Sequence, residues 1–252
     1  MAVQKENTTI TFFAHDGKPT SAGFSPADVS CFAEGPSPFP KGAVDCLSLP
    51  CFLLLTGDAG EPGSHDTLDS CLRDTAIAQR DFILVRVHVN DWMCDYAPWD
   101  YVDQQGVPRV SRFSEVLRYA GEIRTALPAK DVFPLGYSLA GLAAIACYYE
   151  SDGFSGFASC SGALWVDGFE EAVTAYPAHP DGIAYLSLGG REEKSPNPKL
   201  ARVGEQTRRF YGRLKKDTSI RACTLEMVRG GHFGNADQRL AGAVSWLLAN
   251  LR

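Results

Sequence analysis

A serine stands where an apolar stretch of the chain gives way to a run of helix-forming residues. Residues 133–150 read FPLGYSLAGLAAIACYYE, which places Ser138 in a Gly-x-Ser-x-Ala string. In a nucleophile elbow the serine sits on a strained strand-to-helix turn, and its neighbours two positions away must be small. These neighbours are Gly136 and Ala140, so an alanine replaces the final glycine of the usual pattern. The pattern predicts that Ser138 is a nucleophile, and an ordinary strand-to-helix turn is the alternative.

A serine nucleophile needs a base that accepts its proton. The chain has five histidines, at positions 15, 65, 88, 179 and 232. His232 lies in RGGHFGNAD, between a strand-like run and the last helical run, and two preceding glycines permit a tight backbone path. We therefore predict that His232 is the base. His65 is a candidate for the wall of the site, whereas His88 lies within a strand pattern and is predicted to be structural.

The third group of such a site is a carboxylate that orients the imidazole, and it is expected in the chain order serine, acid, histidine. Glu192 and Glu193 follow a strand-like run in YLSLGGREEK, and both meet this requirement. A surface charge pair is the alternative for them. Asp167 is a weaker candidate from the preceding loop, and Asp237 is predicted to cap the last helix.

Attack on a carbonyl creates an oxyanion, which needs hydrogen-bond donors. The backbone N–H of Leu139, directly after the serine, is predicted to be one donor, at the positive end of a helix dipole. A second donor is expected in LLLTGDAGE, as the N–H of Gly57 or Asp58. A simple Gly-Asp turn is the alternative for this stretch.

A long aromatic segment, residues 90–111, separates a strand-like run from a helical run. Long loops of this kind often form lids or pocket walls. Trp92 and Trp99 lie in it, and Trp165 lies farther along the chain. We predict that these three tryptophans shape an apolar or sugar-stacking pocket, with core packing as the alternative.

Strand-like and helix-like runs alternate from residue 50 onward and would position these groups. Apolar runs typical of buried parallel strands occupy residues 51–57, 82–89, 132–136, 154–162, 183–190 and 222–231. Runs typical of helices occupy residues 65–79, 112–127, 139–149, 200–216 and 238–251. The alternation predicts one α/β domain, residues 1–252, with a mostly parallel sheet and helices on both faces. Residues 1–49 are a less regular segment in which TTITFFA is expected to form an antiparallel edge.

Composition excludes several functional classes. The 252 residues are 45% hydrophobic and 21% charged, and the net charge of −6 disfavours a nucleic-acid partner. No apolar run reaches the roughly 18 residues that span a bilayer, and the first residues lack a signal-peptide pattern. The eight cysteines form no Cys-x-x-Cys pair, so reduced thiols and a cytoplasmic location are predicted. Because metal and phosphate motifs are missing from the sequence, no metal or cofactor is expected.

The chain resembles the esterase family of α/β hydrolases that includes esterase D and the enterochelin-esterase-like enzymes. The matching stretches, in the family's order and spacing, are GYSLAGLAA, SCSGALWVDG, YLSLGGREEKSPNP and GGHFGNADQRLAGAVSWLL. The resemblance implies an α/β-hydrolase fold and ester hydrolysis without a cofactor, with Ser138 as nucleophile and His232 as base. A Gly-x-x-Glu match ending at Glu192 favours this carboxylate over Glu193.

The resemblance extends roughly from residue 50 to the C-terminus. Within it, Trp165 matches a tryptophan that lies near the pocket in the family. The sequence departs from the family at Ala140 and in the string Cys160-Ser161-Gly162. Some enterochelin-esterase-like members resemble a Ser-His dyad more than a triad, which leaves a site without an acid as an open alternative.

Together these features predict a serine esterase that cleaves a small-molecule carboxylic ester through an acyl-enzyme. A peptidase or an acyltransferase would share the same three residues, and substrate profiling separates them. A non-catalytic binding protein with a hydrolase fold is the alternative from another class. Loss of the serine or the histidine would mark such a protein, and both residues are present.

Overall fold

An eight-stranded sheet forms the centre of the computed structural model, which describes residues 9–13, 20–23, 49–57, 65–75, 80–127 and 129–252. The strands are β1 (Thr9–Phe13), β2 (Thr20–Gly23), β3 (Cys51–Thr56), β4 (Phe82–His88), β7 (Val132–Tyr137), β8 (Gly156–Cys160), β9 (Gly182–Gly189) and β10 (Ile220–Val228). Their order in the sheet is β10-β9-β8-β7-β3-β4-β1-β2. The six strands from β10 to β4 are parallel, and β1 pairs antiparallel with β4 on one side and with β2 on the other. The predicted mostly parallel sheet is therefore confirmed, and residues Thr9–Phe13 of the TTITFFA stretch form an antiparallel strand.

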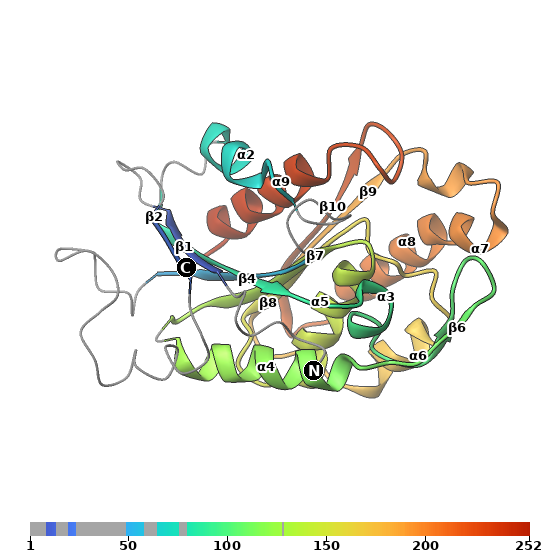
Figure 1. Cartoon of the computed structure of the whole chain (residues 1–252), viewed down its shortest axis with the longest axis horizontal. Coiled ribbons are helices and arrows are strands. Elements are labelled where there is room, and N and C mark those ends of the chain that lie inside the picture. The colour runs from blue at the N-terminus through green and yellow to red at the C-terminus, as the bar shows by residue number, and fades with distance from the viewer. Residues whose placement is uncertain (1–8, 14–19, 24–48, 58–64, 76–79, 128) are drawn as a thin grey trace.

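Helices cover both faces of the sheet (Figure 1). They are α2 (Leu68–Asp74), α3 (Trp92–Asp95), α4 (Phe113–Ala126), α5 (Leu139–Glu150), α6 (Phe169–Ala175), α7 (Pro198–Ala201), α8 (Val203–Leu214) and α9 (Ala236–Ala249). Helices α2 and α9 bury apolar side chains against one face, and α4, α5 and α8 bury theirs against the other. The alternating faces of β3 show the pattern, since Phe52 and Leu54 lie in the first core and Leu53 and Leu55 in the second.

Several predicted elements have different bounds in the structure. The helix expected at residues 200–216 is divided into α7 and α8 at Arg202. Only α2 forms within residues 65–79, of which 76–79 lie outside the described part. The segment 90–111 contains α3 and a two-stranded hairpin of β5 (Tyr101–Val102) and β6 (Pro108–Arg109). In the described part of the chain, no helix combines the length and hydropathy needed to cross a membrane.

Candidate active site

Ser138 occupies a strained turn at the carboxyl end of β7 and at the start of α5. Its backbone has φ 56° and ψ −122°, a conformation that residues other than glycine rarely adopt. A Cβ atom on Gly136 would lie 2.4 Å from the carbonyl oxygen of Ala140, so this turn requires glycine at that position. The Ser138 hydroxyl makes no capping bond to α5. It is therefore available to a partner above the sheet edge.

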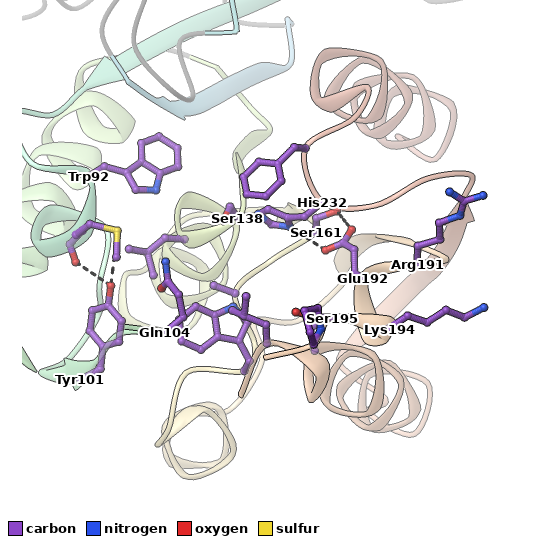
Figure 2. A pocket seen from close by; sticks show the side chains of 18 residues that line it. Trp92, Tyr101, Gln104, Ser138, Ser161, Arg191, Glu192, Lys194, Ser195 and His232 are labelled. Carbon is purple, nitrogen blue, oxygen red and sulfur yellow. Dashed lines mark hydrogen bonds and ion pairs between the residues drawn. The ribbon is translucent and has the colours of Figure 1, made fainter. Parts of the chain in front are cut away.

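Ser138, His232 and Glu192 form one hydrogen-bonded chain (Figure 2). His232 Nε2 lies 2.9 Å from Ser138 Oγ, and His232 Nδ1 lies 2.8 Å from Glu192 Oε2. The Glu192 side chain is 3% exposed, whereas that of His232 is 29% exposed. The structure thus brings together the three residues that the sequence placed at the ends of different strands. Such an arrangement can deprotonate the serine and hold the resulting imidazolium next to a buried carboxylate.

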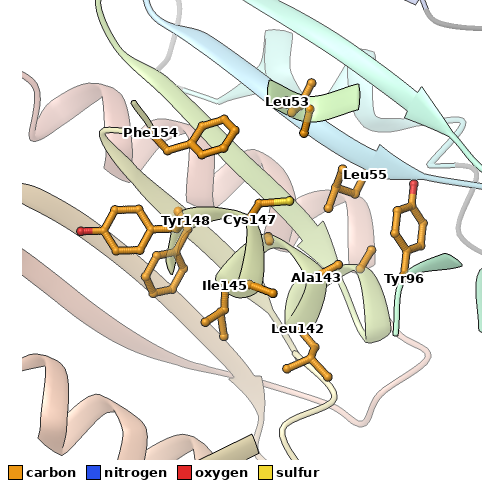
Figure 3. Packing of buried hydrophobic residues seen from close by; sticks show 14 of the residues in the cluster. Leu53, Leu55, Tyr96, Leu142, Ala143, Ile145, Cys147, Tyr148 and Phe154 are labelled. Atoms are coloured by element: carbon orange, nitrogen blue, oxygen red, sulfur yellow. The ribbon is translucent and has the colours of Figure 1, made fainter. Parts of the chain in front are cut away.

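Helix α5, which follows Ser138, is buried along almost its whole length. Every residue from Leu139 to Tyr149 is buried, as expected for a helix that is apolar around its whole circumference. Ala143 and Cys147 belong to the same core as Leu53 of β3 (Figure 3). Because this packing fixes α5 against the sheet, the position of the turn that carries Ser138 is fixed as well.

The Glu192 carboxylate is oriented by several donors besides the histidine. Its Oε1 atom accepts hydrogen bonds from the Gly189 N–H at 2.7 Å, the Ser161 hydroxyl at 2.7 Å and Arg239 Nη1 at 3.0 Å. Burial by itself raises the pKa of Glu192. The hydrogen bond and charge of His232, together with the Ser161 and Gly189 bonds, outweigh burial and hold this pKa below its ordinary value. The carboxylate therefore stays ionised beside the imidazole.

Arg239 links this carboxylate to the loop that carries His232. The arginine is 3% exposed, and its Nη2 atom donates to the Gly231 carbonyl at 2.7 Å. Its Nη1 atom also donates to the Tyr137 hydroxyl at 2.9 Å, and this hydroxyl in turn donates to the His232 carbonyl. Sequence reasoning missed Arg239. The available signal is an arginine directly before the apolar run LAGAVSWLL of the last helix, since a buried arginine needs a carboxylate partner.

Of the predicted oxyanion donors, Leu139 and Gly57 lie in the part of the chain that the structure describes. Leu139 is the first residue of α5, so its N–H has no acceptor inside the helix, and Leu139 lines the cavity in front of Ser138. Gly57 directly follows β3, whose register with β7 brings it level with the elbow. Its carbonyl oxygen lies 2.9 Å from His88 Nδ1, which gives that histidine a structural contact. Asp58 lies outside the described residues.

A cavity of about 430 Å³ opens in front of Ser138 (Figure 2). Trp92 and Trp165 line it, as the sequence predicts, together with Tyr101 and Phe233. Trp99 is absent from the described residues that line this cavity. Its indole N–H donates to the Asp167 carbonyl at 2.6 Å instead, so its prediction as a pocket wall is corrected. Trp92 is the first residue of the short helix α3, whereas Trp99 lies in the loop that follows it.

The other two carboxylates considered as the acid have different partners. Glu193 pairs with Arg208 at 2.6 Å at the surface, which matches the alternative stated for it. Asp167 is exposed and pairs with Arg202 at 2.7 Å and with Lys199 at 3.0 Å. Among the three carboxylates, Glu192 is the one that contacts the His232 ring, at 2.8 Å from Nδ1.

The prediction that Asp237 caps the last helix is wrong. Asn235 occupies the N-cap position of α9, and Asp237 lies in the first turn. The Asp237 carboxylate accepts a hydrogen bond from the Thr67 N–H at 3.0 Å and lies 2.8 Å from His65 Nδ1. His65 is therefore held next to α9 and is not one of the described residues lining the cavity. Among the described residues, no cluster of three or more side chains could hold a metal ion.

Solved structures of hydrolases share this architecture. The siderophore hydrolase EstA from Aspergillus nidulans aligns with a TM-score of 0.66 at 15% identity, covering 96% of this chain and 94% of EstA. An IroE-like serine hydrolase from Shewanella oneidensis aligns at 0.54 and 18% identity, covering 79% and 68% of the two chains. Est1E from Butyrivibrio proteoclasticus aligns at 0.52 and 12% identity, covering 85% and 90%. No protein-family model and no curated protein sequence matches the chain. These similarities show the α/β-hydrolase fold.

Proposed function

We propose that this protein is a serine hydrolase that cleaves a carboxylic ester through an acyl-enzyme intermediate. The observation that carries the proposal is the continuous chain from Ser138 Oγ to His232 Nε2, at 2.9 Å, and from His232 Nδ1 to Glu192, at 2.8 Å. A binding protein that retained the fold without catalysis would not need this chain beside an open cavity. The combination therefore supports catalysis over binding alone.

In the first half of the reaction, Ser138 Oγ attacks the ester carbonyl while His232 Nε2 takes the hydroxyl proton. Glu192 accepts a hydrogen bond from the Nδ1–H group, which leaves Nε2 free to act as the base. The imidazolium then donates its proton to the leaving alcohol oxygen as the carbonyl carbon–oxygen bond breaks. The product of this half-reaction is an acyl group on Ser138 and a free alcohol.

The tetrahedral intermediate needs donors aimed at its negative oxygen. The Leu139 N–H, unpaired within α5 and at the positive end of the helix dipole, is suited to this role. The N–H of Gly57, which follows the neighbouring strand, is the second donor in this proposal. In the second half-reaction, water attacks the acyl group by the same path, and His232 acts again as base and then as acid.

The solved structures support a hydrolytic reaction. EstA is described as a siderophore hydrolase and the protein from Shewanella oneidensis as a serine hydrolase. At 15% and 18% identity these similarities concern the fold, and the active-site geometry of this chain carries the chemistry. Siderophore esters accordingly belong in the first substrate screen, beside simple aryl esters.

Pre-steady-state hydrolysis of p-nitrophenyl acetate tests the proposal. The wild-type protein should release nitrophenolate in a burst, and rapid acid quenching should trap an acetyl group on the peptide that contains Ser138. Ser138→Ala should abolish both signals, and His232→Ala should lower the acylation rate at least about 1,000-fold. Steady hydrolysis that persists in Ser138→Ala, or a wild-type protein that is folded and inert toward the ester panel, would contradict the proposal.

A further inference from the structure

Gln104 places an unsatisfied carboxamide at the cavity. Its Oε1 atom is buried and has no hydrogen-bond partner among the described residues. The residue lines the cavity in front of Ser138, and Figure 2 shows its side chain extending into this space. Buried polar atoms in folded proteins normally have a partner, so an unpaired one in a cavity wall is a candidate for ligand binding.

The turn that carries Gln104 is rigidly built. Asp103 is 2% exposed, and its Oδ1 atom accepts hydrogen bonds from the Gln105 N–H at 2.8 Å and the Val107 N–H at 3.0 Å. Its Oδ2 atom accepts a hydrogen bond from Arg109 Nη2 at 2.8 Å. The turn between β5 and β6 is therefore organised around one buried carboxylate, and the position of Gln104 does not depend on the cavity being filled.

A second set of contacts fixes this turn to a neighbouring segment of the chain. The Gln104 carbonyl accepts a hydrogen bond from Asn197 Nδ2 at 3.0 Å, and Lys199 Nζ donates to the Val102 carbonyl. Asn197 and Lys199 belong to the segment that follows Glu192. The backbone of Gln104 is thus committed to structure, whereas its carboxamide is left for a ligand.

The neighbouring walls are largely apolar. Trp92, Tyr101, Leu139 and Trp165 line the same cavity, and the Tyr101 hydroxyl already donates to the Met93 carbonyl at 3.3 Å. A substrate group that enters this side of the cavity therefore contacts aromatic and aliphatic side chains and the carboxamide of Gln104. A flat apolar group that carries a single polar substituent matches these walls.

The two sides of Ser138 differ in what they offer a substrate. Figure 2 shows Trp92, Tyr101 and Gln104 on one side of Ser138, and His232 on the other. The leaving alcohol must lie near His232, because His232 protonates it. The side that contains Gln104 is consequently the side for the acyl group.

We propose that Gln104 determines specificity by hydrogen-bonding a donor group, an O–H or an amide N–H, on the acyl portion of the ester substrate. This inference rests on the proposed function of the same site. The unpaired Oε1 atom is an acceptor, so the complementary substrate group is a donor. This atom has almost no exposed surface as it stands, so the terminal amide must turn to bring it into the cavity. Rotation of the terminal amide lets Gln104 turn this oxygen toward the bound acyl group.

Three matched aryl esters test the inference: p-nitrophenyl hydrocinnamate, its para-hydroxy derivative and its para-acetamido derivative. Wild-type kcat/KM should be about tenfold higher for at least one donor-bearing ester than for the unsubstituted ester. Gln104→Met keeps a side chain of similar length without the carboxamide, and it should bring the ratio close to one. Gln105→Met is the matched control, because Gln105 is exposed on the same turn, and it should keep the wild-type ratio.

Each outcome decides the inference. A wild-type ratio near one for both donor-bearing esters, or an unchanged ratio in a folded Gln104→Met protein, overturns it while leaving ester hydrolysis intact. Gln104→Ala provides a second variant if Gln104→Met does not fold, and thermal unfolding checks both. A preference for the hydroxy or the acetamido ester identifies which donor the site takes. Absence of any hydrolysis or acyl-enzyme in the wild-type protein refutes the proposed function and this inference with it.

Discussion

Replacing Glu192 by glutamine tests how the carboxylate controls the histidine. Three donors surround Oε1, from Gly189, Ser161 and Arg239, so the amide NH₂ of a glutamine is disfavoured at that position. The amide oxygen must remain there, and the NH₂ group must point at His232 Nδ1. The imidazole then accepts at Nδ1 and carries its proton on Nε2, where it cannot take the proton of the serine.

The expected effect is large because the wrong tautomer disables the base. Loss of the orienting carboxylate in a comparable triad lowers kcat roughly 10,000-fold, and we expect a decrease of about 1,000- to 10,000-fold in Glu192→Gln. This corresponds to about 4–5.5 kcal/mol of transition-state stabilisation. The assay is kcat/KM for p-nitrophenyl acetate, with circular dichroism to confirm that the variant folds.

Glu193→Gln is the matched control. This substitution at the next residue removes the same charge. Glu193, however, pairs with Arg208 at the surface, where ion pairs contribute little to stability. Its kcat/KM should stay within about twofold of wild type. If folded Glu192→Gln retains more than a tenth of wild-type activity, the assignment of Glu192 as the orienting acid is refuted.

Two further predictions concern stability. Gly136→Ala should lower the free energy of unfolding by about 3 kcal/mol, because the added Cβ would lie 2.4 Å from the Ala140 carbonyl oxygen. Gly212→Ala, in α8 with open space around its Cβ position, should raise the free energy of unfolding by about 0.5–1 kcal/mol. Urea denaturation measures both, and equal effects would contradict the packing argument. Burial raises the pKa of Asp237, but the His65 and Thr67 bonds outweigh burial and hold this pKa below its ordinary value. The stabilisation from the Asp237 carboxylate is therefore present at neutral pH and is lost as the pH falls through the folded-state pKa. Asp237→Asn should therefore cost about 1–2 kcal/mol at pH 7 and converge with wild type in acid, and a stability difference that is constant with pH would disprove this account.

The alternation of apolar strands and helical runs was sufficient to predict the parallel sheet, because strands such as β3 and β9 are buried along their whole length and are mostly apolar. Bounds were harder to predict where contacts decide them. The run at residues 200–216 has helical composition throughout, yet it is divided at Arg202, whose side chain bonds the Trp165 carbonyl. A partner that lies 37 residues away leaves no trace in local periodicity.

For the site, residues tied to a backbone pattern were predictable and residues tied to a distant partner were not. Ser138 and His232 follow from a strained turn and a glycine-flanked loop, which local sequence encodes. Arg239 was missed because its role depends on Glu192 and Tyr137, which reach it only in the folded chain. Trp99 was misplaced for the same reason, since composition does not show which way a loop tryptophan points.

Labelling with a fluorophosphonate is the most direct test of the central claim, that Ser138 is a nucleophile activated by His232. The account predicts one phosphonyl adduct on the intact wild-type protein, located on the peptide that contains Ser138, and none on Ser138→Ala. Ser195→Ala, which removes another hydroxyl that lines the cavity, should retain the adduct. An adduct that persists on Ser138→Ala, or no adduct on folded wild-type protein, would contradict the account.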